Sequence, residues 1–102
     1  MVGTVSAKLA EVLRLCSRYH VQRLELFGSA VRGTFELERS DLDFLVTFAP
    51  MEPVDYARSY FGLLAELQTL FERSVDLVEL EAQDNPYFLA AIEPTRELLY
   101  AA

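Results

Sequence analysis

Two aspartates separated by one residue, Asp41 and Asp43, are the residues of this chain best suited to chemistry. They open the apolar segment 41–46, which is predicted to form a buried strand. Because side chains two apart on a strand point to the same face, the two carboxylates are expected to project side by side. Like charges this close are costly unless a cation lies between them, and hard oxygen ligands suit Mg²⁺ or Mn²⁺. The pair therefore predicts a divalent-metal site; the alternative is two strand-end aspartates that face water.

A glycine–serine turn precedes this pair in the sequence. The short alternating run 24–27 predicts a strand that ends at Gly28, and Ser29 is a good N-cap for a helical turn closed by Gly33. Such a turn offers backbone N–H groups to a phosphate, and the missing side chain of Gly28 allows close approach. The alternative is an ordinary strand-to-helix turn without a ligand. Arg32 is either a further cation for the phosphates or the partner of a structural carboxylate.

The two features form one extended motif over residues 27–46, which read FGSAVRGTFELERSDLDFLV. The Phe-Gly-Ser turn and the Asp-Leu-Asp-Phe strand resemble the nucleotidyltransferase superfamily of DNA polymerase beta. The tight form, Gly-Ser-x-x-Arg-Gly followed by Ser-Asp-x-Asp, resembles the minimal nucleotidyltransferases, the smallest branch of that superfamily. Members of this branch are typically paired, as antitoxins, with HEPN-domain ribonuclease toxins. The resemblance covers nearly the whole chain, since the branch consists of little more than the catalytic core.

A third carboxylate, Asp76, lies in the apolar segment 74–80, which predicts another strand. Burial of this carboxylate without a partner would be costly. In the resembled superfamily a third carboxylate on a neighbouring strand completes the metal site, so the resemblance implies that Asp76 is the third ligand. Glu79 is expected on the opposite face of the strand and is the weaker candidate.

The bulk properties limit the class of protein. The 102 residues are expected to form one domain, 1–102, and a hydrophobic content of 52% predicts a globular chain. The single cysteine, Cys16, falls on the apolar stripe of a predicted helix and is expected in the core. A formal net charge of −7 argues against a long nucleic-acid footprint, so no direct DNA binding is expected. Neither a signal peptide nor a membrane span is predicted, which favours a cytoplasmic location.

The remaining periodicities define the elements that must position the site. Helices are predicted over 5–19, 54–72 and the region of 87–92, strands over 24–27, 41–46, 74–80 and 98–100, and a loop over 34–39. With the resemblance, this order predicts an α/β (α+β) domain in which a small mixed sheet of about four strands is flanked by helices, the nucleotidyltransferase fold.

The resemblance also implies a function. AMP would be moved from ATP onto a hydroxyl, that of a tyrosine, on a HEPN ribonuclease toxin, which forms a hetero-oligomer with this chain as its antitoxin. Asp41, Asp43 and Asp76 would be the catalytic residues and would hold two Mg²⁺ ions, while Gly28, Ser29 and Arg32 would bind the triphosphate. Two alternatives remain open: an acceptor hydroxyl on RNA or a small molecule, and a non-catalytic antitoxin that neutralises its partner by binding.

Overall fold

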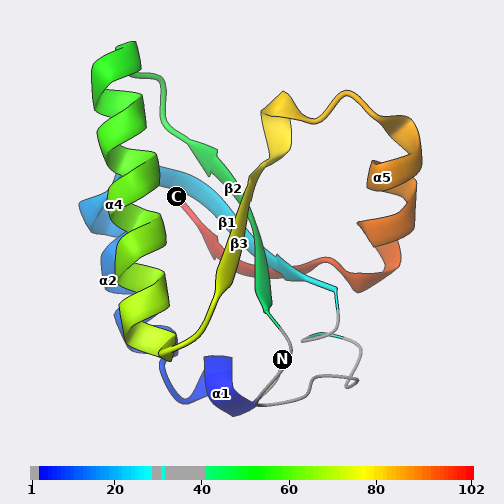
Figure 1. The fold of residues 1–102 in the computed structure, drawn as a ribbon, viewed down its shortest axis with the longest axis horizontal. Coiled ribbons are helices and arrows are strands. Elements are labelled where there is room, and N and C mark those ends of the chain that lie inside the picture. The colour runs from blue at the N-terminus through cyan, green and yellow to red at the C-terminus, as the bar shows by residue number, and fades with distance from the viewer. Residues whose placement is uncertain (1–2, 29–30, 32–40) are drawn as a thin grey trace.

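The computed structural model describes residues 3–28, 31 and 41–102, which fold into a four-stranded mixed sheet with helices packed against it (Figure 1). The helices are α1 Gly3–Ser6, α2 Leu9–Arg18, α4 Pro53–Phe71 and α5 Pro86–Ile92, with two 3₁₀ turns, η1 Leu80–Ala82 and η2 Glu93–Thr95. The strands are β1 Val21–Phe27, β2 Leu42–Phe48, β3 Val75–Glu79 and β4 Glu97–Ala101. The predicted fold class is therefore confirmed.

The strand order is β3-β2-β1-β4, in which β1 runs antiparallel to β2 and β4 while β2 and β3 run parallel. A parallel pair needs a long crossover connection, and α4 supplies it. As a result, β2 and β3 begin at the same edge of the sheet, which is also the edge where β1 ends. Gly28, Asp43 and Asp76 lie at this edge.

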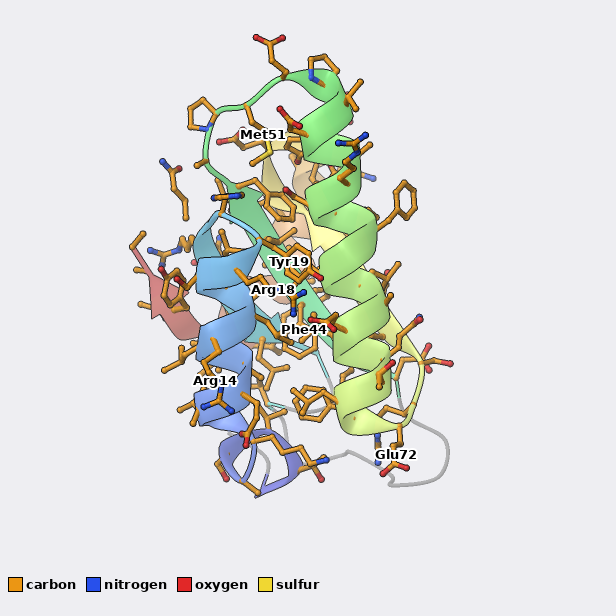
Figure 2. The ribbon with its side chains drawn as sticks, turned by 90° about the vertical axis from the view of Figure 1, so that its left-hand side faces the viewer. Arg14, Arg18, Tyr19, Phe44, Met51 and Glu72 are labelled. Atoms are coloured by element: carbon orange, nitrogen blue, oxygen red, sulfur yellow. The ribbon has the colours of Figure 1, made fainter. Side chains whose placement is uncertain are left out.

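Helices α2 and α4 lie side by side over one face of the sheet (Figure 2). Their apolar stripes meet the strand residues that point to this face, because alternate residues of a strand share a face. The fully buried members of this core include Val12, Cys16, Leu24, Leu26, Phe44, Val46, Leu63 and Leu67. Cys16 is thus a core residue as predicted, and burial raises the pKa of its thiol to about 12, which excludes a reactive thiolate at neutral pH.

The opposite face of the sheet carries a second, smaller core beneath α5. Phe27 of β1, Leu45 of β2 and Ile92 of α5 are buried together there. Phe88 of α5 packs edge-to-face on Phe27, with ring centroids 6.2 Å apart. Helix α5 therefore covers part of the sheet face onto which the strand-start aspartates project.

Two predicted boundaries are wrong. The helix predicted over 5–19 is interrupted after Ser6 by a turn, and the Lys8 ammonium donates to the carbonyl of Leu70 at 2.7 Å, which holds the turn against the end of α4. The first strand begins at Val21, three residues before the predicted start, because a bulge between Val21 and Arg23 breaks the alternation that the prediction relied on. The predicted loop 34–39 lies outside the described residues.

Truncation of Leu67 tests the helix-face core. Leu67 is 0% exposed, so Leu67→Ala is expected to lower the free energy of unfolding by about 2–5 kcal/mol through lost burial and the cavity left behind. Gln68→Ala, one residue along the same helix at an exposed position, should change it by less than about 0.5 kcal/mol. Urea denaturation of both variants measures the difference, and equal effects would show that α4 does not pack as described.

Among the helices that the structure describes, none is long and apolar enough to cross a membrane.

Candidate active site

The three candidate aspartates lie where β2 and β3 begin. Asp43 and Asp76 are register partners across the parallel β2–β3 pair, and Asp43 also faces Phe27 across the antiparallel β1–β2 pair. Asp43 is partly buried, whereas Asp76 is exposed. Asp41 is also exposed and immediately precedes β2, which begins at Leu42. The sheet therefore places the carboxylates of two strands next to each other at an edge that opens to solvent.

The electrostatics of this edge are unfavourable without a cation. Burial, together with the negative charges of Asp76 and Asp41, raises the pKa of Asp43 from 3.8 to about 6, and burial is the largest of these causes. Both neighbours are thus close enough to repel the Asp43 carboxylate. A bound positive charge would relieve this repulsion.

Gly28 brings the backbone against this carboxylate. It has a φ of +79°, in the left-handed region that favours glycine, and the N–H of Val31 donates to its carbonyl at 3.1 Å to close the turn. A Cβ on Gly28 would lie only 2.7 Å from Oδ2 of Asp43. The space that a side chain would fill at Gly28 is therefore next to a metal-ligand candidate, and the close approach of a phosphate at this glycine stays a prediction. Ser29 and Arg32, the other predicted phosphate ligands, lie outside the described residues.

The N–H of Gly28 is already used within the fold. It donates to Oγ1 of Thr95 at 3.0 Å, and the Thr95 hydroxyl in turn donates to the carbonyl of Ile92 at 2.7 Å. Phosphate contacts made by the turn would therefore come from other N–H groups. Sequence reasoning missed Thr95; its one local signal is its place three residues after Ile92, where a threonine hydroxyl can donate back to the helix carbonyl.

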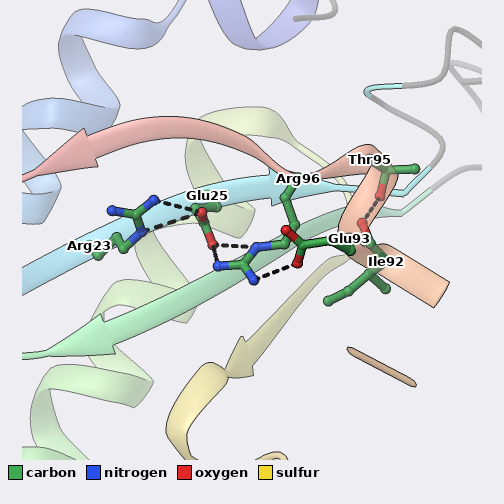
Figure 3. A network of polar contacts seen from close by, with 6 residues as sticks. All are labelled: Arg23, Glu25, Ile92, Glu93, Thr95 and Arg96. Atoms are coloured by element: carbon green, nitrogen blue, oxygen red, sulfur yellow. Dashed lines mark hydrogen bonds and ion pairs between the residues drawn. The ribbon is translucent and has the colours of Figure 1, made fainter. Parts of the chain in front are cut away.

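A buried ion-pair network holds the segment that carries Thr95 (Figure 3). Glu25 of β1 is 4% exposed and accepts two hydrogen bonds from Arg96, from Nη2 at 2.8 Å and from Nε at 3.1 Å. Arg23 donates to its other oxygen, and Arg96 also pairs with Glu93 at 2.9 Å. A buried carboxylate is stable only when paired in this way. The network ties η2 and the start of β4 to the centre of the sheet.

Glu79 is confirmed as lying away from the site. Its carboxylate accepts a hydrogen bond from the hydroxyl of Tyr56 on α4 at 2.7 Å. Glu79 therefore faces the helices and not the aspartate edge, the edge of the sheet where Asp41, Asp43 and Asp76 lie. The alternation of a strand explains the difference from Asp76, three positions earlier.

The donor set is of the kind that fits a divalent cation. Within residues 3–28, 31 and 41–102, no three His, Cys, Asp or Glu side chains are grouped closely enough to hold a metal ion. However, hard carboxylate oxygens on two neighbouring strands, one of them with a raised pKa, are the chemistry that Mg²⁺ or Mn²⁺ would stabilise. Asp43 and Asp76 would hold such an ion, and Asp41 lies two residues before Asp43 in the sequence.

Comparison with known proteins agrees with this geometry. The family described as "Nucleotidyltransferase domain" matches residues 9–98, so the chain belongs to the nucleotidyltransferase domain family. A solved structure of a candidate minimal nucleotidyltransferase is 31% identical, with 95% of each chain covered and a TM-score of 0.68. The sequence has no significant match among curated proteins.

Two more distant structures share the fold. One is a toxin–antitoxin complex with AMP-PNP, at 22% identity and a TM-score of 0.71, where 92% of this chain and 73% of that chain are covered. The other is a tri-AMPylated Shewanella oneidensis HEPN toxin in complex with an MNT antitoxin, at 18% identity and a TM-score of 0.64, where 95% of this chain and 72% of that chain are covered. The predicted membership of the polymerase-beta-like nucleotidyltransferases is confirmed, and the fold matches that of MNT antitoxins.

Proposed function

We propose that this chain is a Mg²⁺-dependent nucleotidyltransferase that moves AMP from ATP onto a hydroxyl, that of a tyrosine, on a HEPN ribonuclease toxin and thereby acts as its antitoxin. The observation that carries the enzymatic part is the register pairing of Asp43 with Asp76, beside a glycine turn that touches Asp43. The solved complexes of HEPN toxins with MNT antitoxins of similar fold support the choice of partner.

Each site residue has its own proposed role in the reaction. Mg²⁺ held by Asp41, Asp43 and Asp76 would neutralise triphosphate charge and make the acceptor hydroxyl more acidic. The turn that begins at Gly28 admits the phosphates close to the backbone, and Ser29 is proposed to contact them. Arg32 is the proposed additional cation.

The exposed position of Asp76 leaves its side of the site open to an acceptor. There the acceptor oxygen forms a bond to the α-phosphorus, and the bond from that phosphorus to the bridging oxygen of the β-phosphate breaks. Pyrophosphate leaves and the hydroxyl proton passes to solvent.

Labelled ATP tests the proposal. The chain is incubated with Mg²⁺ and ATP labelled at the α-phosphate in an extract of its source cells, beside the Asp41→Asn/Asp43→Asn variant and an Asp84→Asn control at an exposed acid. We expect label on one small protein with the wild type and the control but none with the double variant, and peptide mapping should place the AMP on a tyrosine.

Other outcomes would change the function. Label on RNA or on a small molecule would identify a different acceptor. If no label appeared and the double variant still silenced a bound toxin, catalysis would be excluded and neutralisation by binding would replace it.

A further inference from the structure

The η2 segment, Glu93–Thr95, lies far from the glycine turn in the sequence but contacts it directly. Thr95 and Gly28 are 67 positions apart, and the hydrogen bond between them joins η2 to the residue that follows β1. Next to Thr95, Arg96 is held by the buried Glu25 of β1 (Figure 3). Thr95 therefore contacts Gly28 from a segment that the ion pair between Arg96 and Glu25 holds against the sheet.

The hydroxyl of Thr95 is fixed in direction as well as in place. Its proton is given to the carbonyl of Ile92 at 2.7 Å, so a lone pair of the same oxygen is left to face the N–H of Gly28 at 3.0 Å. The side chain is 2% exposed, which excludes water as a ready substitute. One oxygen thus satisfies two backbone groups at once.

Gly28 transmits this constraint to the candidate metal ligand. Its Cα lies so near the Asp43 carboxylate that a Cβ would come within 2.7 Å of Oδ2. A small shift of Gly28 would change both the space available to the carboxylate and the direction in which the turn leaves β1. In an enzyme site, a displacement of about 1 Å can lower the reaction rate about a hundredfold.

We propose that Thr95 is a positioning residue of the nucleotidyltransferase site: its hydroxyl fixes Gly28 against Asp43 and so sets the turn for triphosphate binding. This inference rests on the proposed function, because it assigns Thr95 a role in binding ATP. Thr95 itself touches neither the phosphates nor the reacting atoms, so it is not a catalytic residue.

The test compares Thr95→Val, which keeps the shape and removes the hydroxyl, with Thr95→Ser, which keeps the hydroxyl. Binding of α,β-methylene ATP with Mg²⁺ is measured by calorimetry at a temperature where all chains are folded, and hydrogen exchange of the Gly28 amide is measured by NMR. Thr95→Val should weaken binding about tenfold and speed Gly28 exchange at least about tenfold, as expected for the loss of one hydrogen bond. Thr95→Ser should keep the nucleotide affinity and the Gly28 exchange rate of the wild type. Thr95→Ala removes the same hydroxyl if the valine variant does not fold.

The outcomes separate this inference from the function on which it rests. If the wild type binds the nucleotide and Thr95→Val binds it equally well, Thr95 has only a structural role and the inference is overturned. Equal weakening by Thr95→Ser and Thr95→Val would also overturn it, because the hydroxyl would not be the cause. If the wild type binds no nucleotide, the proposed function fails and this role fails with it, while faster Gly28 exchange in Thr95→Val would still confirm the hydrogen bond.

Discussion

Replacing Asp43 with asparagine is expected to lower nucleotidyl transfer strongly while making the metal-free protein more stable at neutral pH. Activity should fall about a thousandfold, equivalent to about 4 kcal/mol, because the variant loses the charged ligand at the centre of the aspartate edge. Stability should rise because the same charge is repelled by Asp76 and Asp41 and is partly removed from water.

The pH dependence follows from the direction of the Asp43 pKa shift. The pKa is about 6 in the folded protein and near 3.8 in the unfolded chain, so the folded state holds the proton more tightly. Asp43 therefore favours folding below about pH 4 and loses this contribution as the pH rises through 6. A shift of this size corresponds to at most about 3 kcal/mol, and solvent near the partly exposed carboxylate reduces the expected gain of Asp43→Asn at pH 7.5 to about 1–2 kcal/mol.

Thermal unfolding at pH 4 and pH 7.5, with and without Mg²⁺, measures this effect. At pH 7.5 without metal, the unfolding midpoint of Asp43→Asn should lie above that of the wild type by about 4–8 °C for each kcal/mol of stability gained. The difference between the two midpoints should be smaller at pH 4. Added Mg²⁺ should stabilise the wild type and not the variant. Asp84→Asn, which removes an exposed charge, should leave the wild-type behaviour unchanged. A variant that is less stable than the wild type at pH 7.5 would contradict the repulsion at this edge.

The candidate site residues that the sequence predicts are those whose signal is local. Asp43 and Asp76 each stand in a short apolar run, and the alternation of a strand fixes which way each side chain points. Gly28 was predicted from the end of such a run. The apolar runs do not show that the strands bearing Asp43 and Asp76 are neighbours; that expectation came from the resemblance to the nucleotidyltransferase superfamily.

The support of the site could not be predicted because its partners are distant in the sequence. Glu25 and Arg96 are 71 positions apart, and a charged residue inside an alternating run normally indicates the solvent-facing side of a strand. Only the pairing of β1 with β4 brings Arg96 over Glu25 and Thr95 to Gly28. The same holds for the break between α1 and α2, where Lys8 bonds to Leu70 on another helix.

Gly28→Ala is expected to damage both the fold and the site. At a φ of +79° an alanine costs about 1–2 kcal/mol in backbone strain, and its Cβ would lie 2.7 Å from Oδ2 of Asp43. The carboxylate must move to relieve this contact. We therefore expect transfer activity to fall about a hundredfold and the free energy of unfolding to fall by about 2–3 kcal/mol. Gly3→Ala is the matched control, since a Cβ at that position would meet no atom within 4 Å apart from its chain neighbours and the backbone of its own helix.

A double-mutant cycle separates the two causes of the stability loss. In an Asp43→Ala background the carboxylate is absent, so Gly28→Ala should cost only its backbone strain, and the cycle should give a coupling energy of about 1 kcal/mol. Urea denaturation of the four chains measures it. Additive effects would mean that the contact between Gly28 and Asp43 carries no energy, in which case glycine is required at this turn for its φ alone. A measurable coupling would instead make the missing side chain of Gly28 part of the metal-ligand geometry, because the space it leaves is what allows the Asp43 carboxylate to occupy its position.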